Sequence, residues 1–240
     1  MNNLIGKTVL ITGAAKRVGK IFALACGRAG ADVILHHGHS PAEAETVRDE
    51  IASFGSRAWV LTSDLSHADS VSQLISQANT LSPLYALVNS ASIFENLSFQ
   101  ETSLADWEKH IAINLTAPFL LSQAFAKGTS HGRIINILDW RALKPAADHF
   151  PYTITKSALA AMTKSLAVAL APNITVNGLA LGAILPPADN PSAKEKIIAN
   201  VPAKRWSEAN EVEEALLFLL TGPAYITGEI LHLDGGRHLI

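Results

Sequence analysis

The sequence has very little cysteine and contains no long apolar run. Cys26 is the only cysteine among 240 residues, so an internal disulfide and a thiolate metal cluster are both excluded. No stretch has the length and apolar character of a membrane-spanning helix. The first residues, MNNLIGK, lack the basic start and apolar core of a signal peptide. These absences predict a soluble, cytoplasmic protein.

Charge is also scarce, and neither sign dominates. The chain carries 19 Lys and Arg against 21 Asp and Glu, a formal net charge of −2. This balance gives no reason to expect nucleic acid or an anionic membrane as a partner. Apolar residues make up 48% of the chain, which is ample material for one large core. We therefore expect residues 1–240 to form a single domain.

Short apolar runs alternate with helical patterns along the whole chain. The runs that indicate strands are residues 8–12, 32–37, 59–64, 84–90, 133–138, 173–181 and 229–234. Continuous apolar strands separated by helices are typical of a parallel sheet that is buried on both faces. The pattern predicts an α/β fold, a doubly wound parallel seven-stranded sheet of the Rossmann type with right-handed crossovers.

The loop after the first strand, TGAAKRVG (residues 12–19), indicates a dinucleotide site. Gly13 and Gly19 match two glycines of the Rossmann fingerprint, and Arg17 stands where glycine is frequent. Lys16 and Arg17 place two cations at a helix N-terminus, where the helix dipole disfavours positive charge. An anion between them would remove that conflict, since helix N-termini bind phosphate. Two solvated basic residues are the alternative.

The segment HHGHS (residues 36–40) ends the second predicted strand. An NAD-specific site would place an acidic residue here for the ribose 2′-hydroxyl, but the first one is Glu43, inside the next helix. His39 and Ser40 can donate to a 2′-phosphate, which favours NADP(H). Ser40 to Glu43 also reads as a capping box, with Pro41 at the first helical position. No carboxylate or thiolate accompanies the histidines in this segment, so we expect no metal.

Polar residues follow or interrupt three later apolar segments. Asp64 follows the third strand, where it either contacts an adenine edge or caps a turn. The fourth strand ends in NSASIF (residues 89–94), whose small residues leave room for a cofactor. Asn114 interrupts an apolar helical face, so it is either a satisfied structural amide or part of a polar relay. Pro118 removes the N–H that would bond the Asn114 carbonyl, which leaves an acceptor for water.

Tyr152 and Lys156 are spaced to lie on one helix face. A nearby ammonium lowers the pKa of a phenol, which would fit Tyr152 for proton transfer near neutral pH. A casual surface pair is the alternative. The proline-rich stretch 182–206 predicts a long loop, and loops of this length are often functional lids.

Taken together, these features resemble the short-chain dehydrogenase/reductase family over the whole chain. The matching motifs are TGAAKRVG, Asp64, NSAS, Asn114, the Tyr152/Lys156 pair and the closing YITGEILHLDGG. Most members carry a serine thirteen residues before the tyrosine, where this chain has Asp139. The arginine in TGAAKRVG, the LHHGHS segment and Asp139 look like the pteridine reductase branch, which reduces pterins and dihydrofolate with NADPH.

The resemblance implies roles for individual residues. Lys156 would hold the nicotinamide ribose and tune Tyr152, with Asn114 supporting Lys156 through water and Arg17 near both pyrophosphate and substrate. The implied catalytic residues are Asn114, Asp139, Tyr152 and Lys156. The implied cofactor-binding residues are Gly13, Lys16, Arg17, Val18, Gly19, His39, Ser40, Asp64, Leu65, Asn89, Ala91, Tyr152 and Lys156.

The sequence departs from the branch at a few positions. Ile93 falls where an aromatic residue stacks on the pterin, with Phe94 one residue later, so either side chain is a candidate for that contact. His39 replaces a common arginine, which softens the expected preference for NADPH. Leu181-Gly182 replaces the usual Pro-Gly.

Three functional hypotheses follow. The first is an NADPH-dependent pteridine reductase, in which Tyr152 or a water linked to Asp139 delivers a proton to a ring nitrogen. The second is a carbonyl or 3-oxoacyl reductase that tolerates Asp139 in place of serine. The third is a catalytically lapsed nucleotide-binding sensor, which the retained Asn114, Tyr152 and Lys156 argue against. The family resemblance also implies a homotetramer with a small-molecule substrate.

Overall fold

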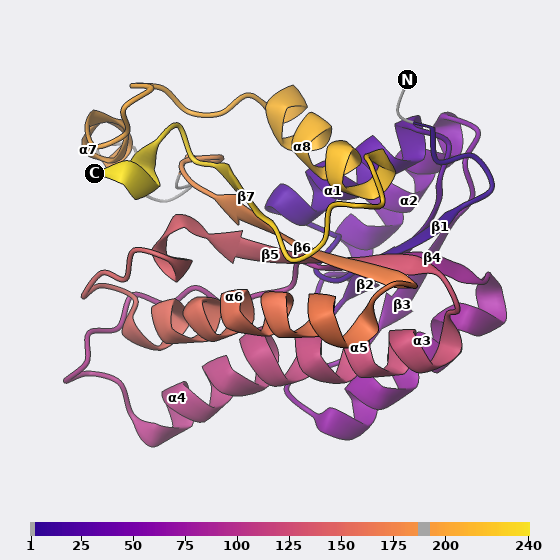
Figure 1. The fold of residues 1–240 in the computed structure, drawn as a ribbon, viewed down its shortest axis with the longest axis horizontal. Helices are drawn as coiled ribbons and strands as arrows, with labels where there is room; N and C mark the ends of the chain where they lie inside the picture. The colour runs from indigo at the N-terminus through magenta and orange to yellow at the C-terminus, as the bar shows by residue number, and fades with distance from the viewer. Residues whose placement is uncertain (1–2, 187–192) are drawn as a thin grey trace.

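The computed structural model describes residues 3–186 and 193–240, which form one parallel sheet with helices on both faces (Figure 1). The strands are β1 (Thr8–Ile11), β2 (Asp32–His37), β3 (Ala58–Thr62), β4 (Leu84–Asn89), β5 (Gly132–Asp139), β6 (Ile174–Leu181) and β7 (Ile230–Leu233). The helices are α1 (Arg17–Arg28), α2 (Pro41–Ser53), α3 (Ala68–Leu81), α4 (Leu104–Ile111), α5 (Ala117–Gly128), α6 (Phe150–Leu170), α7 (Ala193–Ala199) and α8 (Ala209–Thr221). A π-helical turn (Ala112–Thr116) joins α4 to α5, and 3-10 turns follow β5 (Trp140–Ala142) and β7 (Arg237–Leu239).

The strand order is β3-β2-β1-β4-β5-β6-β7, and every neighbouring pair is parallel. The predicted seven-stranded, doubly wound sheet is therefore confirmed. The chain direction across the sheet reverses between β1 and β4. In sheets of this kind, ligands bind outside the carboxyl ends of the strands at that switch point.

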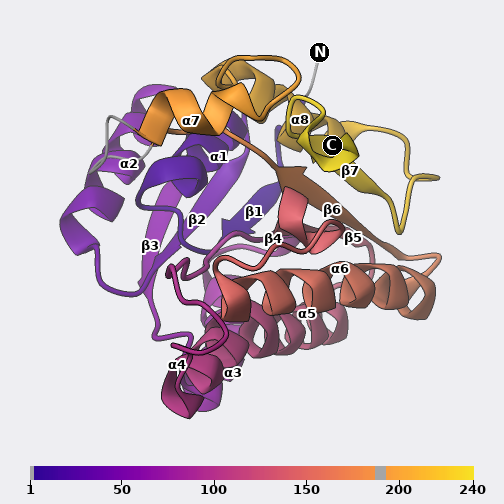
Figure 2. The ribbon, with the colours of Figure 1, turned by 90° about the vertical axis from the view of Figure 1, so that its left-hand side faces the viewer.

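Two helix layers cover the sheet. Helices α1, α2 and α8 lie on one face, and α3, α5 and α6 lie on the other (Figure 2). Successive strand residues point to opposite faces, so Val9 and Ile11 pack with Phe22 of α1, while Leu10 packs with Phe125 of α5. Each fully buried large side chain of this kind contributes roughly 1.5–3 kcal/mol of burial free energy. The sheet is therefore buried on both faces by apolar layers.

The stretch 182–206 is partly helical, because α7 lies within it. The expectation of one continuous loop was therefore wrong for that part. Residues 187–192, which include Pro187 and Pro191, lie outside the described residues, and a lid function for the stretch stays a prediction. Among the described helices, none is both long enough and apolar enough to cross a membrane.

Candidate active site

The predicted site residues gather at the carboxyl edge of the sheet, around the switch point. The loop after β1 contacts the segment after β4, since a Cβ placed on Gly13 would lie 2.9 Å from Ala91 Cα. Asn89 ends β4 and lies opposite Asn136 of β5. Asp139 ends β5, and its side chain meets the first turn of α6.

Helix α6 places Tyr152 and Lys156 on its buried face. The helix begins after His149, with Pro151 in its first turn, where the missing proline N–H costs no helical hydrogen bond. Tyr152 and Lys156 are both almost fully buried. The Lys156 Nζ donates to the Ile137 carbonyl over 2.8 Å and lies 5.6 Å from the centre of the Tyr152 ring. Tyr152 and Lys156 therefore belong to the protein interior, and the alternative of a solvent-exposed surface pair is wrong.

Burial dominates the proton affinity of both groups. It lowers the pKa of Lys156 to about 8, because the charged ammonium loses water, while the Asp139 carboxylate opposes this shift. Burial raises the pKa of Tyr152 well above 10, and Asp139 adds to the rise, whereas Arg141 partly offsets it. The expectation that Lys156 lowers the pKa of Tyr152 was therefore wrong, because burial and Asp139 raise this pKa.

Asp139 contacts the phenol directly. The Tyr152 Oη donates a hydrogen bond to Asp139 Oδ2 over 3.3 Å. The carboxylate thus stands where it stabilises the protonated phenol and disfavours the phenolate. The arrangement presents a neutral phenol that can act as a proton donor.

Asn114 is a fully buried amide in the π-helical turn. Its Oδ1 accepts from the Ile93 N–H over 2.9 Å, and its Nδ2 donates to the Ile93 carbonyl and to Thr155 Oγ1. The side chain therefore ties the segment after β4 to α6. Single π-helical turns often occur at functional sites, and Pro118 supplies no N–H to the Asn114 carbonyl. The water-mediated link to Lys156 stays a prediction.

The glycines of the first loop are required by packing. Gly13 has φ of +66° and faces Ala91 at the close distance given above, a conformation that favours glycine. A Cβ on Gly19 would lie 2.1 Å from the Gly13 carbonyl oxygen. Thr12 Oγ1 accepts from the N–H groups of Ser90 and Ala91 over 2.9 and 3.0 Å. The two loops at the switch point are therefore joined through Thr12.

His36 supports the same loop, a role that the sequence did not reveal. Its Nδ1 accepts from the Gly13 N–H over 3.3 Å, and its Nε2 lies 2.9 Å from the Ser63 carbonyl. Both contacts require the neutral ring with its proton on Nε2, since Nδ1 must accept. Burial lowers the pKa of His36 to about 4, which maintains that form at neutral pH.

Lys16 and Arg17 stand at the N-terminus of α1, as the sequence predicted, and their binding of phosphate stays a prediction. Lys16 forms an ion pair with Glu43 over 2.7 Å. The predicted capping box is wrong, because Glu43 binds Lys16 and the Ser40 side chain forms no cap hydrogen bond. The Ser40 N–H donates instead to His37 Nδ1. Arg17 is exposed, with φ of +50°. Its left-handed backbone fits a position where glycine is frequent.

The other expected cofactor residues line the same edge. Val18 is half-buried, His39 is exposed, and Leu65 is buried. Asp64 Oδ1 accepts from the Ser66 N–H and hydroxyl over 2.9 and 2.7 Å. The structure thus shows the turn-capping role of Asp64, and its contact with adenine stays a prediction.

Asn89 leaves one polar atom open. Its Nδ2 donates to Asn136 Oδ1 over 2.8 Å and to Ser122 Oγ over 3.4 Å. Its Oδ1 is buried and has no hydrogen-bond partner among the described residues. Buried acceptors are usually satisfied, so this oxygen fits a donor supplied by a bound molecule.

Phe94 is the aromatic residue beside the phenol. It is 54% exposed, stacks on His149 with 3.9 Å between ring centres, and meets Tyr152 edge-on at 4.7 Å. The backbone of Ile93 is bonded to Asn114. Of the two candidates for substrate stacking, Phe94 therefore has its ring in contact with Tyr152.

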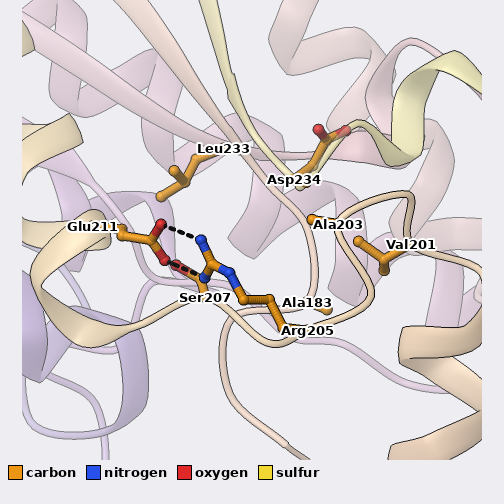
Figure 3. A pocket seen from close by; sticks show the side chains of 9 residues that line it. Ala183, Val201, Ala203, Arg205, Ser207, Glu211, Leu233 and Asp234 are labelled. Carbon is orange, nitrogen blue, oxygen red and sulfur yellow. Dashed lines mark hydrogen bonds and ion pairs between the residues drawn. The ribbon is translucent and has the colours of Figure 1, made fainter.

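A small cavity of about 60 Å³ lies elsewhere, between the segments after β6 and β7 and the entry to α8 (Figure 3). Arg205 and Glu211 close it with two hydrogen bonds of 2.7 Å. The cavity has room for one or two waters. Asp139, Tyr152 and Lys156 do not line it.

The parallel sheet, the glycine loop at its switch point and the buried tyrosine-lysine pair define a dinucleotide-dependent oxidoreductase. Comparisons with known proteins specify the family. A family model described as enoyl-(acyl carrier protein) reductase matches residues 13–238. A 3-oxoacyl-[acyl-carrier-protein] reductase from Synechocystis is 33% identical, with 98% of each chain covered. The chain belongs to the short-chain dehydrogenase/reductase family, as the sequence predicted.

Solved structures are equally similar. FolM alternative dihydrofolate reductase 1 from Brucella canis, complexed with NADP, has a TM-score of 0.93 and 33% identity, covering 100% of this chain and 97% of that one. A short-chain dehydrogenase from Burkholderia cenocepacia, also in complex with NADP, has a TM-score of 0.92 and 30% identity, covering 98% and 99%. The NADP in these structures agrees with the cofactor expected from the sequence.

Proposed function

We propose that this protein is an NADPH-dependent reductase of pterins, of the dihydropteridine, dihydromonapterin or dihydrofolate type. The observation that carries the proposal is the position of Asp139, whose Oδ2 accepts a hydrogen bond from the Tyr152 phenol over 3.3 Å. A carboxylate at this position can accept a hydrogen bond from a ring N–H, which suits a substrate whose reduction adds a proton to a ring nitrogen. The similarity to the NADP-bound Brucella alternative dihydrofolate reductase supports the same substrate class.

The residues at the switch point fit the cofactor. Gly13 brings the loop backbone to the sheet edge without a Cβ, as an approaching pyrophosphate requires. Helix α1 has no acidic residue in its first turn, and Lys16 and Arg17 precede or begin it, which suits a phosphate. Asn89 Oδ1 offers the unpaired acceptor described above. When bound, NADPH supplies the hydride for the reduction.

The chain's own groups supply the proton. Reduction of a C=N bond adds hydride to carbon and a proton to nitrogen. The raised pKa of Tyr152 keeps its phenol protonated at neutral pH. In the proposed step the phenol gives this proton to the ring nitrogen, and the Arg141 guanidinium offsets part of the negative charge left on the phenolate. Asp139 orients the Oη by accepting its hydrogen bond, and it provides an acceptor for a substrate N–H. Phe94 offers an exposed ring for stacking on a planar substrate.

The second candidate is a carbonyl or 3-oxoacyl reductase, which the Synechocystis relative favours. Its substrate develops negative charge on oxygen, so the site must donate hydrogen bonds to that oxygen. A serine hydroxyl donates such a bond, whereas an ionised Asp139 does not. This difference in hydrogen bonding is the reason for placing the pterin first.

Steady-state oxidation of NADPH with a panel of dihydropterins, dihydrofolate and a β-ketoester tests the proposal. We expect the highest kcat/KM for one of the pterin-type substrates. Reduction of the ketoester alone would contradict the pterin assignment and support the second candidate. The family resemblance also leads us to propose a homotetramer, which sedimentation velocity at several protein concentrations would test.

A further inference from the structure

Arg141 lies directly behind Asp139 in the 3-10 turn that follows β5. Its side chain is only 11% exposed. Its backbone N–H donates to Asp139 Oδ1 over 2.9 Å, and its Nη1 approaches the same oxygen at 3.4 Å. The other oxygen, Oδ2, accepts from Tyr152. The two oxygens of one carboxylate therefore have separate partners.

The far side of the guanidinium is fixed as well. Arg141 Nη2 and Nε donate to the two oxygens of Asp148 over 2.8 and 3.3 Å. The guanidinium also lies over the Trp140 ring, 4.6 Å from its centre. Bidentate contacts of this kind hold the planar group in one orientation. Asp148 directly precedes the residue that caps α6, so the same contact anchors the entry to the catalytic helix.

We propose that Arg141 is a positioning residue, which holds Asp139 through Oδ1 so that Oδ2 stays directed at Tyr152 and the substrate. This inference rests on the proposed function, because it assigns Asp139 a part in the reaction. Without the guanidinium, only the Arg141 backbone N–H would hold Oδ1, and the Asp139 side chain would lose its charged contact and part of its fixed orientation towards the phenol. Misplacement of a catalytic group by about 1 Å can cost on the order of 100-fold in rate.

The charges at the site support this role. The Asp139 carboxylate has the same sign of charge as a phenolate forming on Tyr152, and the Arg141 guanidinium compensates part of the carboxylate's charge. Arg141 accordingly offsets the effects that raise the pKa of Tyr152. The pair of Asp139 and Arg141 thus gives the site a carboxylate acceptor at a much smaller electrostatic cost than a lone carboxylate.

A double-mutant cycle tests the inference with Arg141→Met, Asp139→Asn and the combined variant. We expect Arg141→Met to lower kcat about 10- to 100-fold with little change in NADPH affinity. In the Asp139→Asn background, the same substitution should change kcat by less than about threefold. Additive losses would overturn the inference, because they would show that Arg141 acts independently of Asp139.

Chemical rescue separates positioning from a general loss of structure. Guanidinium ion, added to Arg141→Ala below its denaturing range, should restore part of kcat and leave the parent unchanged. Arg237→Gln is the matched control, since the Arg237 guanidinium also lies over Trp140, at 4.3 Å, while the described ion pair of Asp139 is with Arg141. A failed rescue together with an equal loss in Arg237→Gln would contradict the proposal.

The cycle is run on whichever substrate the parent reduces. If the parent reduces only the ketoester, the pterin assignment fails while the coupling between Arg141 and Asp139 can still be measured. If the parent reduces pterins but the losses are additive, the positioning role alone fails. The two failures are therefore distinguishable.

Discussion

The phenol of Tyr152 donates to Asp139 Oδ2 over 3.3 Å, whereas Lys156, one helical turn further along α6, donates to the Ile137 carbonyl over 2.8 Å. The tyrosine is thus paired with a carboxylate and not with the lysine. Burial and this pairing both raise the pKa of Tyr152, which keeps the phenol protonated, and the pairing gives Asp139 a direct contact with the phenol.

Tyr152→Phe removes the transferable proton while keeping the ring. Because general acid catalysis is typically worth about 10²–10⁴-fold, we expect kcat to fall by that factor with NADPH affinity nearly unchanged. Steady-state NADPH oxidation measures kcat, and fluorescence titration measures the NADPH affinity. Tyr225→Phe is the control, because that side chain is fully exposed. Near-normal turnover in Tyr152→Phe would show that the proton comes from another group.

The absence of an acidic residue directly after β2 predicts a preference for NADPH over NADH, together with the cluster of Lys16, Arg17, His39 and Ser40. Loss of one charged contact to phosphate costs roughly 1.5–3 kcal/mol, about ten- to a hundredfold in affinity. We expect Lys16→Met to weaken NADPH binding by about tenfold and to leave NADH binding unchanged. Lys20→Met is the control, since Lys20 is a half-exposed cation on the same helix. Equal affinity of the parent for both cofactors, by titration, would contradict this prediction.

Acid should loosen the first loop through His36. Its pKa falls from 6.5 to about 4 in the folded protein, so the folded state binds fewer protons than the unfolded state between these values. The stabilisation is present above pH 6.5 and is lost as the pH falls towards 4. A shift of this size corresponds to roughly 3 kcal/mol.

The test compares urea unfolding of the parent and His36→Gln between pH 4 and pH 7. We expect the parent to lose more free energy of unfolding than the variant across this range, with His131→Gln, an exposed histidine, behaving as the parent does. Parallel pH dependences in the parent and His36→Gln would disprove the link.

The strands and the shared helix face of Tyr152 and Lys156 were predictable because their signals are local. The apolar run of β1 and the four-residue spacing of Tyr152 and Lys156 depend only on neighbours along the chain. His36 was missed because its partners, Gly13 and Ser63, reach it only when three strands pack together. The capping box at Ser40 failed for a related reason, since Lys16 of another segment binds Glu43. The effect of burial on Tyr152 also depends on tertiary packing, which no residue spacing reveals.

The most direct test of the pterin assignment is the ratio of kcat/KM for a dihydropterin and a β-ketoester, measured in the parent and in Asp139→Ser. If Asp139 serves a pterin, the parent favours the dihydropterin and Asp139→Ser loses most of that activity, because a hydroxyl replaces neither the charge nor the second acceptor oxygen of the carboxylate. Asp139→Ala should lose it as well, and circular dichroism checks that both variants fold. If the substrate is a ketone, the serine restores an oxyanion donor, worth about 10²–10³-fold. An Asp139→Ser variant that reduces the dihydropterin as well as the parent does, or gains strongly on the ketoester, would contradict the assignment.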